Sequence, residues 1–116
     1  MSKTESATAA TQTHAHEFLG STEISGPIAH NHRFAGVTSQ AIKVPGGHVH
    51  EFLTNTDFFF NHLHEAGART GLQIPVGGGR HVHFAEGVTT FNFGHSHEFR
   101  FATLIENPIE NMDSDK

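Results

Sequence analysis

The chain has 116 residues, a formal net charge of −5 at pH 7 with neutral histidines, and no Cys, Trp or Tyr. Its length predicts one small domain with a thin core. The lack of cysteine excludes disulfides and thiolate metal sites, and the negative charge argues against a nucleic-acid groove. No stretch approaches the ~20 apolar residues of a membrane span. We therefore expect neither nucleic acid nor membrane as a partner.

The two ends of the chain differ in composition from the middle. The first 13 residues, MSKTESATAATQT, are small and polar and contain no apolar segment of the kind found in secretory signals. We expect residues 1–13 to form a flexible tail and the protein to be cytoplasmic, with release by lysis or a leaderless route as the alternative. The acidic residues 109–116 are expected to form a second flexible tail. The folded domain is predicted to span residues 14–108.

From His14 onward, a His-x-His motif occurs six times, and the six motifs contain all 12 histidines of the chain. Residues i and i+2 of a β-strand face the same side, about 6.6 Å apart along the backbone. Two imidazoles of one motif can therefore converge on a single metal ion, and we predict that all the histidines are metal ligands. The six pairs are His14/His16, His30/His32, His48/His50, His62/His64, His81/His83 and His95/His97.

Each motif begins a longer unit that reads H-x-H-x-F-x-G-x-T. A threonine follows the first histidine by eight residues in all six copies, whereas the Phe and Gly positions vary in some copies. The defining positions are all even offsets, which is the periodicity of a strand rather than of a helix. Charged residues such as Glu17, Glu51 and Glu65 occupy an odd offset. The unit therefore predicts strands with histidine inward and charge outward.

The six units group into three blocks. The pairs that begin at His14, His48 and His81 are 34 and 33 residues apart, and turns rich in Pro and Gly at residues 44–48 and 74–81 close the first two blocks. We predict an all-β fold of six repeats. It would be an antiparallel strand meander, a barrel, or a prism with pseudo-threefold symmetry of three ~33-residue blocks, with the histidine face inward.

Strands that alternate in direction would sort the pairs by their place in the block. The first pair of each block, here called A-type, would gather at one end, and the second pair, B-type, at the other. Each end would then hold six imidazoles, which is an octahedral set, with the phenylalanines as a dry core between them. The same arithmetic holds across chains, where each pair would meet its copies in a trimer or a larger homo-oligomer.

The expected function is that of a transition-metal-binding β-repeat protein whose ions organise the fold or an oligomer. Six imidazoles favour Fe(II), Ni(II) or Co(II), whereas four-coordinate sites would favour Zn(II) or Cu(II). A filled coordination shell leaves no position for a substrate, so we expect no enzymatic activity. One alternative is a metal storage or buffer protein. Another is a small non-heme metalloenzyme that would use a carboxylate such as Asp57 or Glu65 beside the His62 pair.

The segments HNHRFAGVT (30–38), GRHVHFAEGVTTF (79–91) and FATLIENP (101–108) resemble the YmaF family of bacteria, whose members carry His-x-His repeats. The resemblance covers nearly all residues from His14 to Pro108 and implies no particular activity. A weaker resemblance, limited to the His-x-His spacing, is to the iron-binding tip of the long tail fibre of contractile-tailed phages. There, three strands hold iron octahedrally, which implies that six-histidine sites are feasible in proteins.

Overall fold

The computed structural model describes residues 13–106 of the chain. Every regular element in this range is a β-strand, and the range contains no helix that is long and apolar enough to cross a membrane. The tails predicted at residues 1–13 and 109–116 lie outside the described residues, apart from Thr13, whose N–H and hydroxyl donate to the side chain of Gln40. The ten strands are β1 (Glu17–Ser21), β2 (Arg33–Val37), β3 (Ile42–Val44), β4 (Gly47–Val49), β5 (Glu51–Asn55), β6 (Glu65–Arg69), β7 (Ile74–Gly77), β8 (Arg80–Val82), β9 (Phe84–Val88) and β10 (Glu98–Ala102).

The strands pair as five antiparallel hairpins. Three long hairpins, β1–β2, β5–β6 and β9–β10, have strands of five residues. Two short hairpins, β3–β4 and β7–β8, connect the long ones along the chain. The all-β, antiparallel part of the prediction is confirmed. A continuous meander or closed barrel is not formed, because the hydrogen bonds between long hairpins lie only near their ends and each hairpin remains a separate two-stranded sheet.

The long hairpins contact one another edge to edge, β2 with β5, β6 with β9, and β10 with β1. Each of these three seams carries two backbone hydrogen bonds, one near either end. The donor is always the N–H of the residue after the repeat threonine, and the acceptor is always the carbonyl of the residue after a second histidine. The six bonds run from Glu23 to Glu98, Ser39 to Glu51, Asp57 to Arg33, Gly71 to Phe84, Thr90 to Glu65 and Leu104 to Glu17.

The core between the hairpins is a small cluster of phenylalanine and alanine. Within each long hairpin, a large residue of one strand faces a small residue of the other. Phe18 lies opposite Gly36, and a Cβ added to Gly36 would lie 2.8 Å from the Phe18 ring. The same holds for Phe34 with Gly20, Phe52 with Ala68, Phe99 with Gly87 and Phe101 with Ala85, whereas Ala66 faces Thr54. The irregular Phe and Gly positions of the repeat therefore follow from size complementarity across the hairpin.

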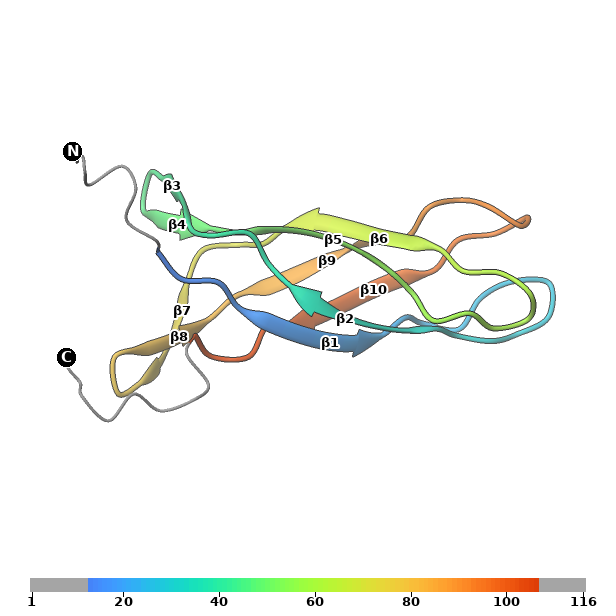
Figure 1. Ribbon diagram of the computed structural model, residues 1–116, viewed down its shortest axis with the longest axis horizontal. Helices are drawn as coiled ribbons and strands as arrows, with labels where there is room; N and C mark the ends of the chain where they lie inside the picture. Colours follow the sequence, from blue (N-terminus) through green and yellow to red (C-terminus); the bar gives the residue numbers. More distant parts are fainter. Residues whose placement is uncertain (1–12, 107–116) are drawn as a thin grey trace.

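The long axis of the molecule measures 53 Å, and the three long hairpins run along it (Figure 1). The loops that join the strands of the long hairpins, residues 22–32, 56–64 and 89–97, lie together at one end. The two short hairpins lie at the opposite end (Figure 1). In the β7–β8 hairpin, Gly78 and Gly79 form the predicted turn with φ of 64° and 75°, a conformation that glycine adopts without strain. The strand polarity thus separates the A-type from the B-type histidines.

Candidate metal centre

The twelve histidines lie in two clusters. The A cluster contains the A-type pairs: His14, His16, His48, His50, His81 and His83. The B cluster contains the B-type pairs: His30, His32, His62, His64, His95 and His97. One ring nitrogen from each A-cluster residue lies within 4.8 Å of all the others, and the same holds for five residues of the B cluster. His64 joins that group through its Nε2, which is 3.2 Å from Nε2 of His95. The predicted grouping by block position is confirmed within a single chain.

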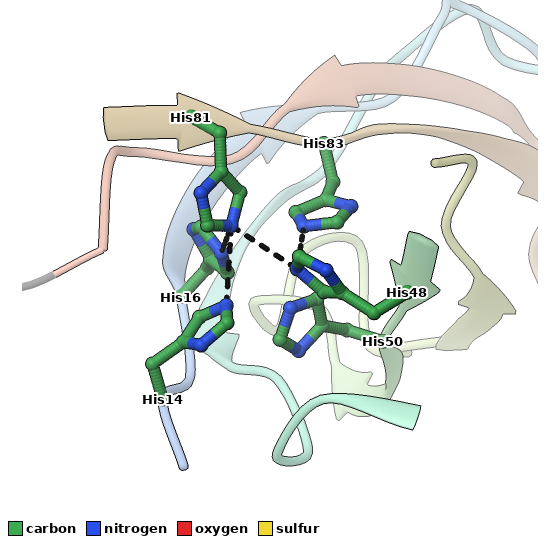
Figure 2. Close-up of side chains that lie close together, drawn as sticks. All are labelled: His14, His16, His48, His50, His81 and His83. Atoms are coloured by element: carbon green, nitrogen blue, oxygen red, sulfur yellow. Dashed lines mark hydrogen bonds between the residues drawn. The ribbon is translucent and has the colours of Figure 1, made fainter. Parts of the chain in front are cut away.

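The A cluster is built from three directions (Figure 2). His14 and His16 precede β1, His48 and His50 come from β4 and the residue after it, and His81 and His83 from β8 and the residue after it. The Nε2 atom of His81 lies 3.1 Å from Nε2 of His14, His16 and His48. His83 and His48 also place their Nε2 atoms 3.1 Å apart. The rings meet at steep angles, as between His14 and His48 at 88°. Six rings thus direct nitrogen toward one point.

In every pair the second histidine is fixed by the backbone of a neighbouring hairpin. A carbonyl oxygen can only accept a hydrogen bond, so the ring Nδ1 bonded to it must carry the hydrogen, and Nε2 of the neutral ring keeps only a lone pair. The accepting carbonyl belongs to the residue after the repeat threonine. The N–H of that same residue makes the seam bond. The six contacts are His16 with Leu104, His32 with Asp57, His50 with Ser39, His64 with Thr90, His83 with Gly71 and His97 with Glu23.

The first histidines of the B cluster are fixed in the same way by their own turns. Nδ1 of His62 donates to the carbonyl of Phe60 and Nδ1 of His95 to that of Phe93, at 2.9 and 3.0 Å. Both phenylalanines have positive φ, 53° and 58°, which costs a non-glycine residue on the order of 1–3 kcal/mol. His30 donates to Ile28 at 2.7 Å. All six B-cluster rings therefore present an Nε2 lone pair inward.

The first histidines of the A cluster are held differently. His81 has its Nδ1 3.4 Å from a carboxylate oxygen of Glu106, whose other oxygen accepts the backbone N–H of His81 at 3.0 Å. Within residues 13–106, no hydrogen-bond partner is found for Nδ1 of His14 or His48. Only half of the A-cluster rings are thus anchored to backbone carbonyls.

The repeat threonines close the hydrogen-bond ladder of each long hairpin. The hydroxyl of Thr38 accepts the N–H of His16 at 3.0 Å, and the N–H of Thr38 donates to the carbonyl of His16. The other five threonines make the same two bonds to the second histidine of the facing strand. These threonines lie at strand ends rather than in turns, and they set the backbone position from which the imidazole projects.

Burial favours the neutral form of eight of the imidazoles. It is the largest cause of lowered pKa values among them, and the approach of neighbouring imidazoles lowers them further. The pKa is lowered to about 4 for His14, His83 and His97. It is also lowered for His16, His32, His48, His50 and His64. Burial alone would raise the pKa of Glu106, but the hydrogen bond from the His81 N–H contributes to holding it below its usual value.

Two buried ring nitrogens have no partner among the described residues, Nε2 of His50 and Nε2 of His97. An unpaired polar atom in the interior costs about 1–3 kcal/mol. Both atoms face the centre of a cluster, one in each, where a bound cation would satisfy them. The donor set therefore fits a transition-metal ion at each end of the molecule.

The carboxylates near the His62 pair do not join the B cluster. Glu65, like Glu17, Glu51 and Glu98, is exposed on the outward face of its strand. Asp57 lies 3.2 Å from Nδ1 of His32, on the side of the ring away from the cluster centre, and accepts the N–H of Arg33. Two contributors were missed from the sequence: Glu106, which stands in no His-x-His unit, and the carbonyl groups that orient the rings.

Comparison with known proteins adds one finding. A family model named YmaF, described as spore germination protein GerY/YamF, matches residues 11–105. No curated protein and no solved structure matches the chain.

Proposed function

This chain belongs to the YmaF family, and from its two histidine clusters we propose that it binds two transition-metal ions, one at each end of the molecule. All twelve histidines serve as ligands in this proposal. The observation that carries it is the tautomeric state of the B cluster. Each neutral ring has one N–H, which Nδ1 donates outward. The Nε2 atom of His62 therefore cannot bond to Nε2 of His30 or His32, which lie 3.3 and 3.1 Å away. A cation between these lone pairs would remove their repulsion.

The spacing supports six-coordinate ions, because all six A-cluster nitrogens lie within 4.8 Å of one another, close to the separation of opposed ligands in an octahedron. In an octahedron, neighbouring ligands are √2 times the metal–ligand distance apart. The 3.1 Å between Nε2 atoms of His81 and His48 then corresponds to about 2.2 Å from each nitrogen to the centre, close to ordinary metal–imidazole bonds of about 2.0–2.1 Å. We therefore favour Fe(II), Ni(II) or Co(II). Zn(II) or Cu(II) would use fewer of the rings.

We propose that the ions stabilise the fold and do not catalyse a reaction. The buried apolar cluster is small, so ions that cross-link three hairpins at either end would supply much of the folding free energy. Six imidazoles leave no coordination position for a substrate. A non-heme enzyme is less well supported, because Asp57 contacts the outer nitrogen of His32. A storage or buffer role would require easily exchanged ions at both ends.

The equivalent seam bonds support a three-sided prism with a pseudo-threefold axis through both clusters. Each cluster is assembled from one chain, so we propose that metal binding does not need an oligomer. Association of copies and the cytoplasmic location remain predictions, which the mass of the metal-loaded protein and cell fractionation test. On the basis of the family description, we propose that metal binding by this protein serves spore germination.

The test is metal content and thermal stability of protein purified without a histidine tag. We expect two ions per chain by elemental analysis, and a large drop in Tm after exhaustive treatment with EDTA, because the ions bind the folded state alone. Refilling with Ni(II) should restore the Tm. His32→Ala should reduce the content toward one ion per chain. An unchanged Tm after metal removal would contradict the structural role.

A further inference from the structure

The two clusters differ in how firmly their rings are held. In the B cluster every Nδ1–H is bonded to a backbone carbonyl, so no imidazole can rotate without breaking that bond. In the A cluster the rings of His14 and His48 have no such bond within residues 13–106, and the ring of His81 is held by the side chain of Glu106. The A-cluster ligands are therefore freer to turn away.

The clusters differ equally in access to water. The first histidines of the B cluster are buried, and the ring of Phe93 stacks on His62 at 4.6 Å with an interplanar angle of 13°. Phe60 lies edge-on to His30 at 5.5 Å. With Pro27 and Ile28, these two phenylalanines line an apolar recess of about 200 Å³ over the cluster. The first histidines of the A cluster are partly exposed, with 15% of the His81 side chain accessible to water, and no aromatic ring other than histidine contacts them in the described chain.

We propose that the A cluster is an exchangeable metal site and the B cluster a permanent one, so that the folded protein takes up and releases one ion per chain. This inference rests on the proposed function. An ion leaves a site when its ligands detach one after another. A detached ring that is still bonded to a carbonyl stays aimed at the ion and binds again, whereas a free ring turns into water. All six rings of the B cluster are bonded to backbone carbonyls, whereas three rings of the A cluster are not.

Glu106 is the positioning residue that sets how tightly the A cluster holds its ion. Its carboxylate is largely buried, with 12% of the side chain exposed; one oxygen accepts the backbone N–H of His81, and the other lies 3.4 Å from Nδ1 of the same residue. His81 is the ring whose Nε2 approaches three others, so its orientation bears on the whole cluster. A carboxylate bonded to a ligand imidazole raises its basicity, and its loss typically weakens metal binding about 10–100-fold.

The experiment follows release of Ni(II) from the fully loaded folded protein into an excess of a metallochromic chelator. We expect two phases of one ion each, with the slow phase on the order of 100-fold slower or more, because its release waits for the folded loops to open. Glu106→Gln should accelerate the fast phase about 10-fold and leave the slow phase unchanged. Phe93→Ala should accelerate only the slow phase. Phe91→Ala, in the same loop with 75% of its side chain exposed, is the matched control and should change neither.

His48→Ala should abolish the fast phase and keep the slow one. The trace of the unaltered protein decides the main point even if a variant fails to fold. Two bound ions that leave in a single phase overturn this inference and keep the proposed function. A slow phase that disappears in His48→Ala also overturns it, because the assignment of the sites would be reversed. A protein that takes up no nickel overturns the proposed function and this inference together.

Discussion

At each histidine pair, backbone and threonine groups decide which ring nitrogen is free to bind an ion. The carbonyl of the residue after the repeat threonine accepts a hydrogen bond from Nδ1 of the second histidine. A threonine hydroxyl accepts the backbone N–H of the same histidine. Such outer contacts usually accompany histidine ligands and determine their tautomer. These carbonyl bonds raise the pKa of the second histidines, but burial lowers it by more, which makes the metal-free protein sensitive to acid.

We expect the metal-free protein to lose stability as the pH falls from 6.5 toward about 4. Burial lowers the folded-state pKa of His83 and His97 from 6.5 to about 4. Between these values the unfolded chain binds protons that the folded chain does not, so each step downward favours unfolding. Above pH 6.5 neither state binds them and the contribution is constant. Urea unfolding of chelator-treated protein should show a level midpoint above about pH 7 and a falling midpoint below it. A midpoint that stays level to about pH 4.5 would contradict this account.

The histidines and threonines could be predicted from the sequence because their side chains themselves make the contacts of the site and recur in all six units. The orienting carbonyls could not. The six residues that supply them share no side-chain property, since only the peptide group takes part: Glu23, Ser39, Asp57, Gly71, Thr90 and Leu104. Glu106 gave no signal either, because it occurs once and outside the repeat.

At the scale of the hairpin, one peptide group performs two tasks. The N–H of Leu104 donates to Glu17, which forms the seam between β10 and β1, and its carbonyl holds the ring of His16. Packing of the hairpins and aiming of the imidazoles are therefore coupled through a single backbone unit. A change that removes the N–H should disturb both.

Leu104→Pro should lower the free energy of unfolding by about 1–3 kcal/mol, because it removes a donor and leaves the Glu17 carbonyl unpaired. It should also speed metal loss from the A cluster. The Leu104 side chain is 44% exposed, so Leu104→Ala keeps the peptide group and should change stability by about 0.5 kcal/mol or less. Denaturant titration of both variants checks the prediction. Equal stability of the two would show that the seam bond contributes little.

Gly36→Ala tests the size complementarity of the core. The new Cβ would lie 2.8 Å from the Phe18 ring, so the ring must shift, at a cost of about 1–3 kcal/mol. Gly71 provides the control, because a Cβ there would meet its nearest atom at 3.8 Å. Denaturant unfolding should therefore separate the two variants clearly. Equal stability of the Gly36→Ala and Gly71→Ala proteins would show that the Phe18 ring can shift at little energetic cost.

The sequence predicted the long strands but not the conformation of the turn before the His62 pair. The even offsets identified the long strands and their inward face, because alternation of burial is a local property. The Phe58–Phe60 run, which precedes the His62 pair, leads into a turn in which Phe60 has positive φ. Its conformation depends on the bond from His62 to the Phe60 carbonyl, which sequence periodicity does not reveal.

At the scale of the molecule, the two clusters lie at opposite ends of a 53 Å body with the phenylalanine core between them. Each cluster takes two rings from each of three segments, so the removal of a second ring from a damaged cluster matters less than the first. Clusters at opposite ends share no ligand. The coupling between histidine substitutions should therefore depend on cluster membership rather than on distance along the sequence.

Double substitutions test this arrangement. His48→Ala and His81→Ala should together cost clearly less stability than the sum of the single changes, because both act on one site. His48→Ala and His62→Ala, which are closer in the sequence, should be additive within about 0.5 kcal/mol, because they act on different sites. Metal content and denaturant unfolding of the three single and two double variants provide the measurement. Additivity of His48→Ala and His81→Ala would argue that the pairs containing these two residues bind separate ions.

The seam between β10 and β1 has the same two hydrogen bonds as the other seams, although within residues 13–106 no connecting hairpin spans it. The order of the blocks along the polypeptide is thus independent of their arrangement in space. A circular permutant that starts within the glycine turn at 77–79 and joins the original ends by a linker would keep every seam and both sets of rings. For this architecture, the position of the break between the first and last blocks is arbitrary.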